Sequence, residues 1–387
     1  MLPNLKEYFL IDPDVVFLNH GSFGATPKPV FESYQRWQLE LERQPVEFLG
    51  RRHNELMRFS RSKLAEYVDT SENNVVYVTN VTVGLNIVAR SLTLGPGDEV
   101  LATDHEYGAL ERTWRFLAKE RGFTYKSCQI SLPLPSANEF VEHFWKSVTP
   151  QTRVIFISQI ASPTAVIFPV AEICARARSA GILTVIDGAH VPGQLPLALD
   201  TLGADFWSGN LHKWLMSPKG SGFLYASPEV QHLLKPLVVS WGYEAEVPGP
   251  SQFVDYQEWM GTRDPAAFLA VPDAIKFQED HNWELVREEC FNLATYAQEV
   301  ICDLTGLAAL HKPGARTFRQ VVAIPLPANT DVVALKSRLY DEYHIEVPVH
   351  AWNGKKMTRV SVQGYNSKED INRLYQALKV LLPKTTN

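Results

Sequence analysis

The spacing of apolar residues divides the chain into regions of different predicted structure. Residues 27–68 carry apolar side chains at helical spacing and predict helices that are interrupted at Pro45. From Asn74 onward, short apolar runs such as VVYVT, EVLAT, RVIFIS and ILTVID alternate with amphipathic segments such as AEICARARSAG. Strands that alternate with helices in this way predict a mostly parallel sheet with helices on both faces.

The alternation stops after about residue 235. A segment that contains Pro and Gly, WGYEAEVPGPSQ, precedes a long helical region at about residues 265–304. A smaller α+β unit follows, with the runs FRQVVAIPL, IEVPVH and MTRVSVQ and a final helix. The sequence therefore predicts an α/β protein in three parts: an N-terminal segment that associates with the small domain (1–25), a large domain (26–260), and a small α+β C-terminal domain that includes the linking helix (261–387).

Composition narrows the class of protein. At 387 residues the chain is too long for one small core, in agreement with two domains. The formal net charge of −6 argues against nucleic acid or an anionic membrane as a partner. No apolar run approaches the roughly eighteen residues of a membrane helix, and the charged N-terminus does not resemble a signal peptide. The cysteines are scattered without metal-ligand spacing, which predicts no metal site and favours a reducing cytoplasm; they are Cys128, Cys174, Cys290 and Cys302.

Three side chains suited to cofactor chemistry follow three of the predicted strands. Thr82 lies where VVYVTN turns into a helix, and helix starts attract phosphate, although Thr is also a common helix cap. Asp187 ends ILTVID, where its carboxylate either meets a cation or caps a loop. Lys213 follows DFWSGNLH; a desolvated lysine is a nucleophile toward carbonyls, whereas most lysines are solvated. Because ligands gather at the carboxyl ends of parallel strands, the three together predict a cofactor site.

These segments resemble the class V aminotransferase family, a group of fold-type-I enzymes that use pyridoxal 5′-phosphate (PLP). The resemblance runs from FLNHGSFGATP at Phe17–Pro27 to TRVSVQGYNSKEDINRL at Thr358–Leu374. The runs LNHGSFG, DHEY at Asp104–Tyr107, NLHKWL at Asn210–Leu215 and QGYNSKED are most similar to the isopenicillin N epimerase-like branch. The resemblance implies the PLP-dependent transferase fold, with a seven-stranded sheet in the large domain, and a homodimer with active sites shared across the interface.

The resemblance also implies roles by position. Lys213 would hold PLP as a Schiff base and carry the Cα proton, Asp187 would pair with the pyridine nitrogen, and Tyr107 would stack on the ring. His190 would be a further catalytic residue at the 3-oxygen of the ring or at the substrate, although a plain loop histidine is an equal interpretation. Other cofactor contacts would come from Thr82, Val83, Ser162, Asn210 (which replaces a common serine), His212 and, across the interface, Thr262. The amino-acid substrate would contact Asn19, His20, Gly21 and His350, and its carboxylate would bind Arg359.

The reaction stays open among chemistries that share Cα deprotonation of an amino acid and a quinonoid intermediate. Epimerisation or racemisation is the first hypothesis. A cysteine- or cystine-type C–S lyase or an aminotransferase is the second, and a non-catalytic binding protein is a remote third. Cysteine desulfurases of this family carry a nucleophilic cysteine on a loop shortly before the arginine that binds the carboxylate. The resemblance therefore implies that the chain is not a cysteine desulfurase, because the corresponding stretch, EVPVHAWNGKKMTRVS, contains no cysteine. An epimerase needs a second acid–base group, for which His20, His190 and His350 are the candidates.

Overall fold

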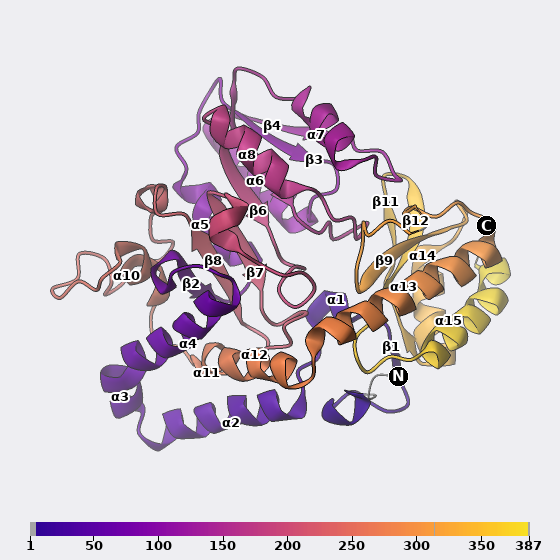
Figure 1. The fold of residues 1–387 in the computed structure, drawn as a ribbon, viewed down its shortest axis with the longest axis horizontal. Helices are drawn as coiled ribbons and strands as arrows, with labels where there is room; N and C mark the ends of the chain where they lie inside the picture. Colours follow the sequence, from indigo (N-terminus) through magenta and orange to yellow (C-terminus); the bar gives the residue numbers. More distant parts are fainter. Residues whose placement is uncertain (1–4, 313, 386–387) are drawn as a thin grey trace.

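The larger part of the molecule is built on one central sheet (Figure 1). The computed structural model describes residues 5–312 and 314–385. Seven strands lie in the order β2-β8-β7-β6-β5-β3-β4. β8 is antiparallel to both neighbours, and the remaining pairs are parallel, which confirms the predicted fold class. The strands are β2 (Val75–Val78), β3 (Glu99–Thr103), β4 (Thr124–Cys128), β5 (Thr152–Ser158), β6 (Leu183–Asp187), β7 (Phe206–Asn210) and β8 (Gly222–Ala226).

Both faces of this sheet are covered, which explains why its strands read as continuous apolar runs. Successive side chains of a strand point to opposite faces. Along β5, Ile155 and Ile157 belong to one buried cluster, whereas Val154 and Phe156 belong to another. Helix α8 packs in the first cluster, and α5 and α6 pack in the second. The helices are α5 (Val81–Ser91), α6 (Gly108–Arg121), α7 (Ala137–Trp145), α8 (Val170–Ser179) and α9 (Leu199–Leu202).

The predicted break at Pro45 is confirmed. Helix α2 (Lys28–Arg43) ends just before it, and Pro45 is the first residue of the short α3 (Pro45–Glu47). Proline fits this first position because the amide it lacks would have no partner inside the helix. A π-helical turn then leads into α4 (His53–Tyr67). Both α2 and α4 pack on the later helices α11 (Ala266–Leu269) and α12 (Val271–Asp280).

The smaller part is a three-stranded antiparallel sheet backed by helices. Its order is β11-β12-β9. The N-terminal strand β1 (Val16–Phe17) pairs with β10 (Ile345–Glu346) of this part, next to the final helix in the view of Figure 1. The elements are β9 (Val321–Leu326), α14 (Val332–Tyr343), β11 (Val349–Trp352), β12 (Lys355–Ser361) and α15 (Lys368–Leu381).

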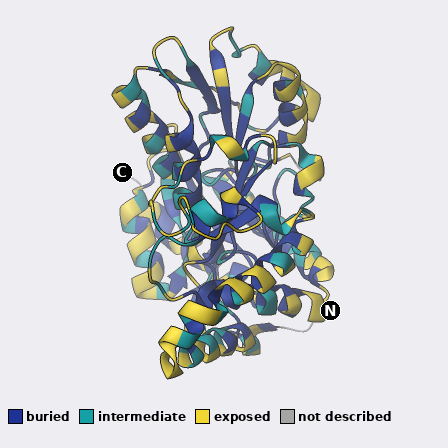
Figure 2. Ribbon diagram, turned by 90° about the vertical axis from the view of Figure 1, so that its left-hand side faces the viewer, coloured by how far each residue is buried: buried dark blue, intermediate teal, exposed yellow. Residues whose placement is uncertain are grey.

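The helical region predicted at residues 265–304 consists of three helices. They are α11 (Ala266–Leu269), α12 (Val271–Asp280) and α13 (Trp283–Thr305), and α13 leads into the small sheet (Figure 1). Breaks occur just before Pro272, which lies in the first turn of α12, and where Asn282 adopts a left-handed backbone conformation. Buried positions fill the interior and exposed ones lie on the outer helix faces (Figure 2). Among the described residues, no helix is both long and apolar enough to cross a bilayer.

Candidate active site

A cavity of about 330 Å³ lies where β5, β6 and β7 end and α5 begins. This is the edge at which parallel sheets bind ligands. The strand ends contribute side chains from each of these elements, and the loops before α6 and after β7 close the space. Eight of the residues predicted from the sequence line this cavity: Thr82, Tyr107, Ser162, Asp187, His190, Asn210, His212 and Lys213.

Lys213 is half-buried in the cavity wall. Its Nζ lies 3.0 Å from Nε2 of His190. Burial lowers the pKa of the Lys213 amine to about 7; the nearby Arg359 lowers it further and Asp187 opposes the shift. A lysine that is partly unprotonated near neutral pH is a nucleophile and a base, whereas an ordinary surface lysine is neither.

Asp187 presents a buried carboxylate at the end of β6. Its Oδ1 accepts a hydrogen bond of 2.8 Å from the backbone N–H of Ala189. It forms no ion pair within residues 5–312 and 314–385. Burial raises its pKa to about 6, while the Ala189 N–H and the Lys213 charge act in the opposite direction. A buried carboxylate in this position gains stability from any cation that enters the cavity.

The start of α5 has one amide left for a ligand. Asn80 caps the helix, and its Oδ1 accepts from the backbone N–H of Val83. The side-chain oxygen of Asn210 accepts from the N–H of Val81. Within the described part of the chain, the N–H of Thr82 is left without an acceptor in this turn, and the Thr82 side chain lines the cavity. Thr82 is therefore not the helix cap, and its amide and hydroxyl suit an anion such as phosphate.

Arg359 lies beside the cavity as a buried guanidinium. Its Nη1 donates to the carbonyl oxygen of Ser162 at 2.7 Å, its Nη2 donates to Oγ of Ser22 at 3.2 Å, and its buried Nε has no hydrogen-bond partner. It forms no ion pair with the described residues, and burial lowers its pKa to about 10. Together with His350 and Tyr107 it lines a second cavity of about 700 Å³, which shares Tyr107 with the first. A substrate carboxylate would provide the missing countercharge.

Comparison with known proteins identifies the family. A sequence model described as aminotransferase class-V matches residues 18–374. The chain belongs to the class-V aminotransferase family. It is 34% identical to an isopenicillin N epimerase of Amycolatopsis lactamdurans, over 98% of each chain, and 35% identical to that of Streptomyces clavuligerus, over 96% of each. A putative L-cysteine desulfhydrase of Oryza sativa subsp. japonica is 28% identical, over 95% of this chain and 83% of the relative.

Solved structures share the fold. A cystine C–S lyase in complex with cysteine persulfide superposes with a TM-score of 0.83 at 22% identity, over 95% of this chain and 98% of that one. An apo cysteine desulfurase from Thermococcus onnurineus NA1 gives a TM-score of 0.85 at 19% identity, over 99% of both chains. The protein is therefore an enzyme of this family with the PLP-dependent transferase fold, and its cofactor is PLP.

The cavity of this class-V enzyme fits PLP at each of its ends. The amine of Lys213, whose pKa is lowered, suits the aldehyde, and the carboxylate of Asp187 has no ion-pair partner among the described residues. Thr82 offers a free amide where a phosphate would lie. His212 lines the same end, where its Nδ1–H donates to the carbonyl of Ser221 at 2.8 Å. Burial lowers the pKa of His212 to about 4, although the Ser221 bond opposes this.

Two residues predicted to contact the substrate, His20 and Gly21, pack against residues around the lysine segment. His20 is fully buried; its Nδ1 lies 2.9 Å from the hydroxyl of Tyr365 and its Nε2 3.0 Å from the carbonyl oxygen of Lys213. Gly21 packs against Trp214, and a Cβ at this position would approach the indole ring to 3.1 Å. These residues support the segment that carries the lysine.

Asn19 and Thr262 also have defined surroundings. The side-chain amide of Asn19 donates to Oε1 of Glu346 at 2.9 Å, in the small domain. Thr262 is exposed in the loop between α10 (Gln252–Glu258) and α11, which is where a residue offered to a partner subunit would be found.

Some residues around the site were not predicted from the sequence. Asn80 is the true cap of α5, and the TN pair before the helix is a signal that could have identified it. Glu106 is buried beside the cavity, accepting hydrogen bonds from Thr103 and from the amide and hydroxyl of Ser158; burial raises its pKa to about 8. Trp214 donates to His190, a contact between two separate loops that no local pattern reveals.

Proposed function

We propose that this protein is a PLP-dependent epimerase or racemase of an amino acid. The observation that carries the proposal is the full-length identity of 34–35% to two isopenicillin N epimerases. The buried charges of Lys213, Asp187 and Arg359 support it, since each suits one part of an amino acid joined to the cofactor. An amino acid with a free α-carboxylate is the substrate class that Arg359 favours.

Several residues of the chain have separate roles in moving a proton at Cα of the substrate. PLP, when bound, supplies the electron sink that makes this proton acidic. Lys213, with a pKa of about 7, removes and returns the proton on its own side. Arg359 would bind the substrate carboxylate, and Asp187 would hold the protonated ring nitrogen of the cofactor. Tyr107 lines the cavity as an aromatic wall.

Inversion also requires a group on the other side, and His350 is our candidate. His190 lies beside Lys213, and both ring nitrogens of His20 have partners. The Nε2–H of His350 donates to the carbonyl of Pro163 at 3.0 Å, which leaves its Nδ1 able to accept a proton. Burial lowers the pKa of His350, with Arg359 adding to the effect, so its neutral form prevails at pH 7.

A C–S lyase is the second candidate, because relatives named L-cysteine desulfhydrase are 26–28% identical. Persulfide chemistry is not favoured, since burial raises the pKa of all four thiols: Cys128, Cys174, Cys290 and Cys302. The test is incubation of the holoenzyme with isopenicillin N and a panel of L- and D-amino acids in deuterated water. We expect inversion with Cα deuteration. Release of pyruvate and sulfide from cysteine-type substrates, without any inversion, would replace the epimerase by the lyase.

The proposed active unit is a cytoplasmic homodimer that shares its sites. All four cysteines are free thiols, as expected in a reducing compartment. The exposed Thr262 would contact the phosphate in the partner's cavity. Replacement of Thr262 by Ala should weaken PLP retention without changing the mass measured by light scattering. An active monomer would contradict this arrangement.

A further inference from the structure

Trp214 follows the lysine directly and is fully buried. Its Nε1 lies 3.2 Å from Nδ1 of His190. An indole N–H can only donate a hydrogen bond, so Nδ1 of His190 must be the acceptor and carries no proton. The proton of a neutral His190 therefore resides on Nε2.

This assignment makes His190 a donor toward the lysine. Its Nε2 lies 3.0 Å from Nζ of Lys213. A doubly protonated imidazole would set two donors, its Nδ1–H and the indole N–H, against each other. Burial independently lowers the pKa of His190 well below 6.5, and the charges of Lys213 and Arg359 act in the same direction. The His190 ring is thus neutral. Its Nε2–H points to Nζ of Lys213 and can form a hydrogen bond only if that nitrogen is an acceptor.

We propose that Trp214 is a positioning residue: its N–H fixes His190 in the Nε2–H tautomer, so that His190 only donates at the reacting amine. A free amine accepts such a bond, and an ammonium cannot. The bond consequently favours the base form of Lys213. The opposite tautomer would accept a hydrogen bond from the ammonium through its unprotonated Nε2 and so stabilise the inactive form. Every reaction considered above begins at this amine, so the inference stands whether the enzyme is an epimerase or a lyase.

The surroundings hold the indole ring in place. The amide of Gln278 donates to the carbonyl of Trp214 at 2.9 Å. The His20 ring lies 5.0 Å from the indole, centroid to centroid. Gly21 leaves room for the ring, because a side chain there would meet it and Oγ of Ser361. The first glycine of the LNHGSFG run, Gly21, therefore serves the orientation of Trp214.

Other charges also act on Lys213. Asp187 favours its protonated form and Arg359 disfavours it. His212 and Tyr107 line the same cavity. Trp214→Phe removes the indole N–H together with part of the ring but changes none of these charges, so it tests the contribution of the tautomer against a control of the same change in size. The matched control is Trp207→Phe, which deletes another buried indole N–H, bonded to Gln159 at 2.9 Å.

The tautomer can be read directly in cofactor-free protein. Protein labelled with ¹⁵N in its histidine rings is compared with His190→Gln to assign the two nitrogens of His190. In the wild type and in Trp207→Phe, we expect a protonated Nε2 and an unprotonated Nδ1. In Trp214→Phe, we expect a mixture of both tautomers. A wild-type ring protonated at Nδ1 would overturn the proposal even if Trp214→Phe does not fold.

The second readout is the pH dependence of Lys213 modification by formaldehyde and borohydride, followed on its peptide by mass spectrometry. Reactivity should rise with pH through about 7 in the wild type, since the free amine reacts. In Trp214→Phe this midpoint should move up by about one unit, and in Trp207→Phe it should not move. An unchanged midpoint in Trp214→Phe would reject the role of the tautomer, whatever reaction the holoenzyme catalyses.

Discussion

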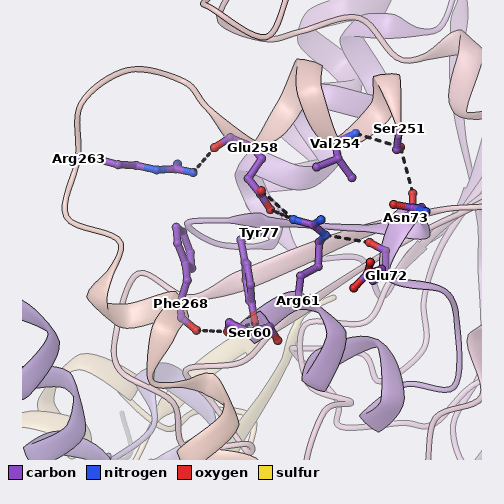
Figure 3. A network of polar contacts seen from close by, with 10 residues as sticks. All are labelled: Ser60, Arg61, Glu72, Asn73, Tyr77, Ser251, Val254, Glu258, Arg263 and Phe268. Carbon is purple, nitrogen blue, oxygen red and sulfur yellow. Dashed lines mark hydrogen bonds and ion pairs between the residues drawn. The ribbon is translucent and has the colours of Figure 1, made fainter. Parts of the chain in front are cut away.

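Two clusters of buried charge in the molecule differ in whether their charges have partners within the protein. In the first, shown in Figure 3, Nη1 of Arg61 contacts both carboxylate oxygens of Glu258 at 2.6 and 2.7 Å, and its Nε donates to the carbonyl of Glu72. Arg263 donates to the backbone oxygen of Glu258 from the loop that carries Thr262. In the active site, Asp187 forms no ion pair with any described residue.

The difference separates charges that serve the fold from charges that serve a ligand. A buried charge with a complete set of protein partners is costly to disturb, because removing one partner strands the other. A buried charge without a countercharge lowers the stability of the free protein, and binding of an oppositely charged ligand reduces this loss. The Arg61–Glu258 pair thus anchors the segment before Thr262, whereas Arg359 and Asp187 are the charges that we propose to be neutralised by the substrate and the cofactor.

The largest expected effect is that of Lys213→Ala. This variant should lower kcat by about 10⁴-fold or more, since it removes both the cofactor attachment and the base. Its stability should match or exceed that of the wild type, because a poorly solvated amine is removed. Borohydride reduction of the wild-type holoenzyme followed by peptide mapping should place the pyridoxyl group on Lys213. A label on Lys219, or full activity of Lys213→Ala, would contradict the assignment.

Asp187→Ala should have the next largest effect. The loss of a charge that stabilises the transition state costs about 10²–10³-fold in rate. We expect deuterium exchange at Cα to fall by this factor while the variant still binds PLP, measured by its absorbance after gel filtration. The control is Asp200→Ala, a partly exposed carboxylate outside the cavity that accepts bonds from Thr70 and Tyr225. Near-normal exchange in Asp187→Ala would end this account of its role.

A direct test of the comparison pairs Glu258→Gln with Arg359→Met. The first leaves Arg61 as an unpaired buried cation and should destabilise the apoprotein by about 3–5 kcal/mol. The second removes a buried charge that lacks an ion-pair partner, so stability should change by less than about 1 kcal/mol while kcat/KM falls at least about tenfold. Urea unfolding of both apoproteins, with steady-state kinetics of the holoenzymes, measures the two effects. Equal destabilisation by both variants would remove the distinction.

Sequence patterns predicted a mostly parallel sheet and three residues of the cavity (Thr82, Asp187 and Lys213), because these follow from local order, whereas the resemblance to the family supplied Tyr107, Ser162, Asn210 and His212. Apolar runs mark strands that are buried on both faces, and the residues that end those strands necessarily meet at one edge. Contacts between distant segments were not predictable in this way. His20 resembles a substrate contact in sequence, yet both its ring nitrogens are taken up by Tyr365 and the Lys213 backbone. Trp214 reads as a core residue, and only the folded structure brings its N–H to His190.

The narrowest expected effect, which is confined to inversion, concerns the side of the substrate opposite Lys213. If His350 is the second acid–base group, His350→Gln should lower inversion by about 10²-fold, within the range for general acid–base groups. Exchange of the Cα hydrogen on the Lys213 side should stay within about twofold, because Lys213 and Asp187 are unchanged. His143→Gln is the control, since His143 is exposed and bonds to the Gln129 carbonyl. Chiral chromatography and mass spectrometry of one reaction in deuterated water measure both rates together. A parallel fall in inversion and exchange would show instead that His350 only helps to bind the substrate, and the second group would have to be sought at Tyr107, which lines both cavities.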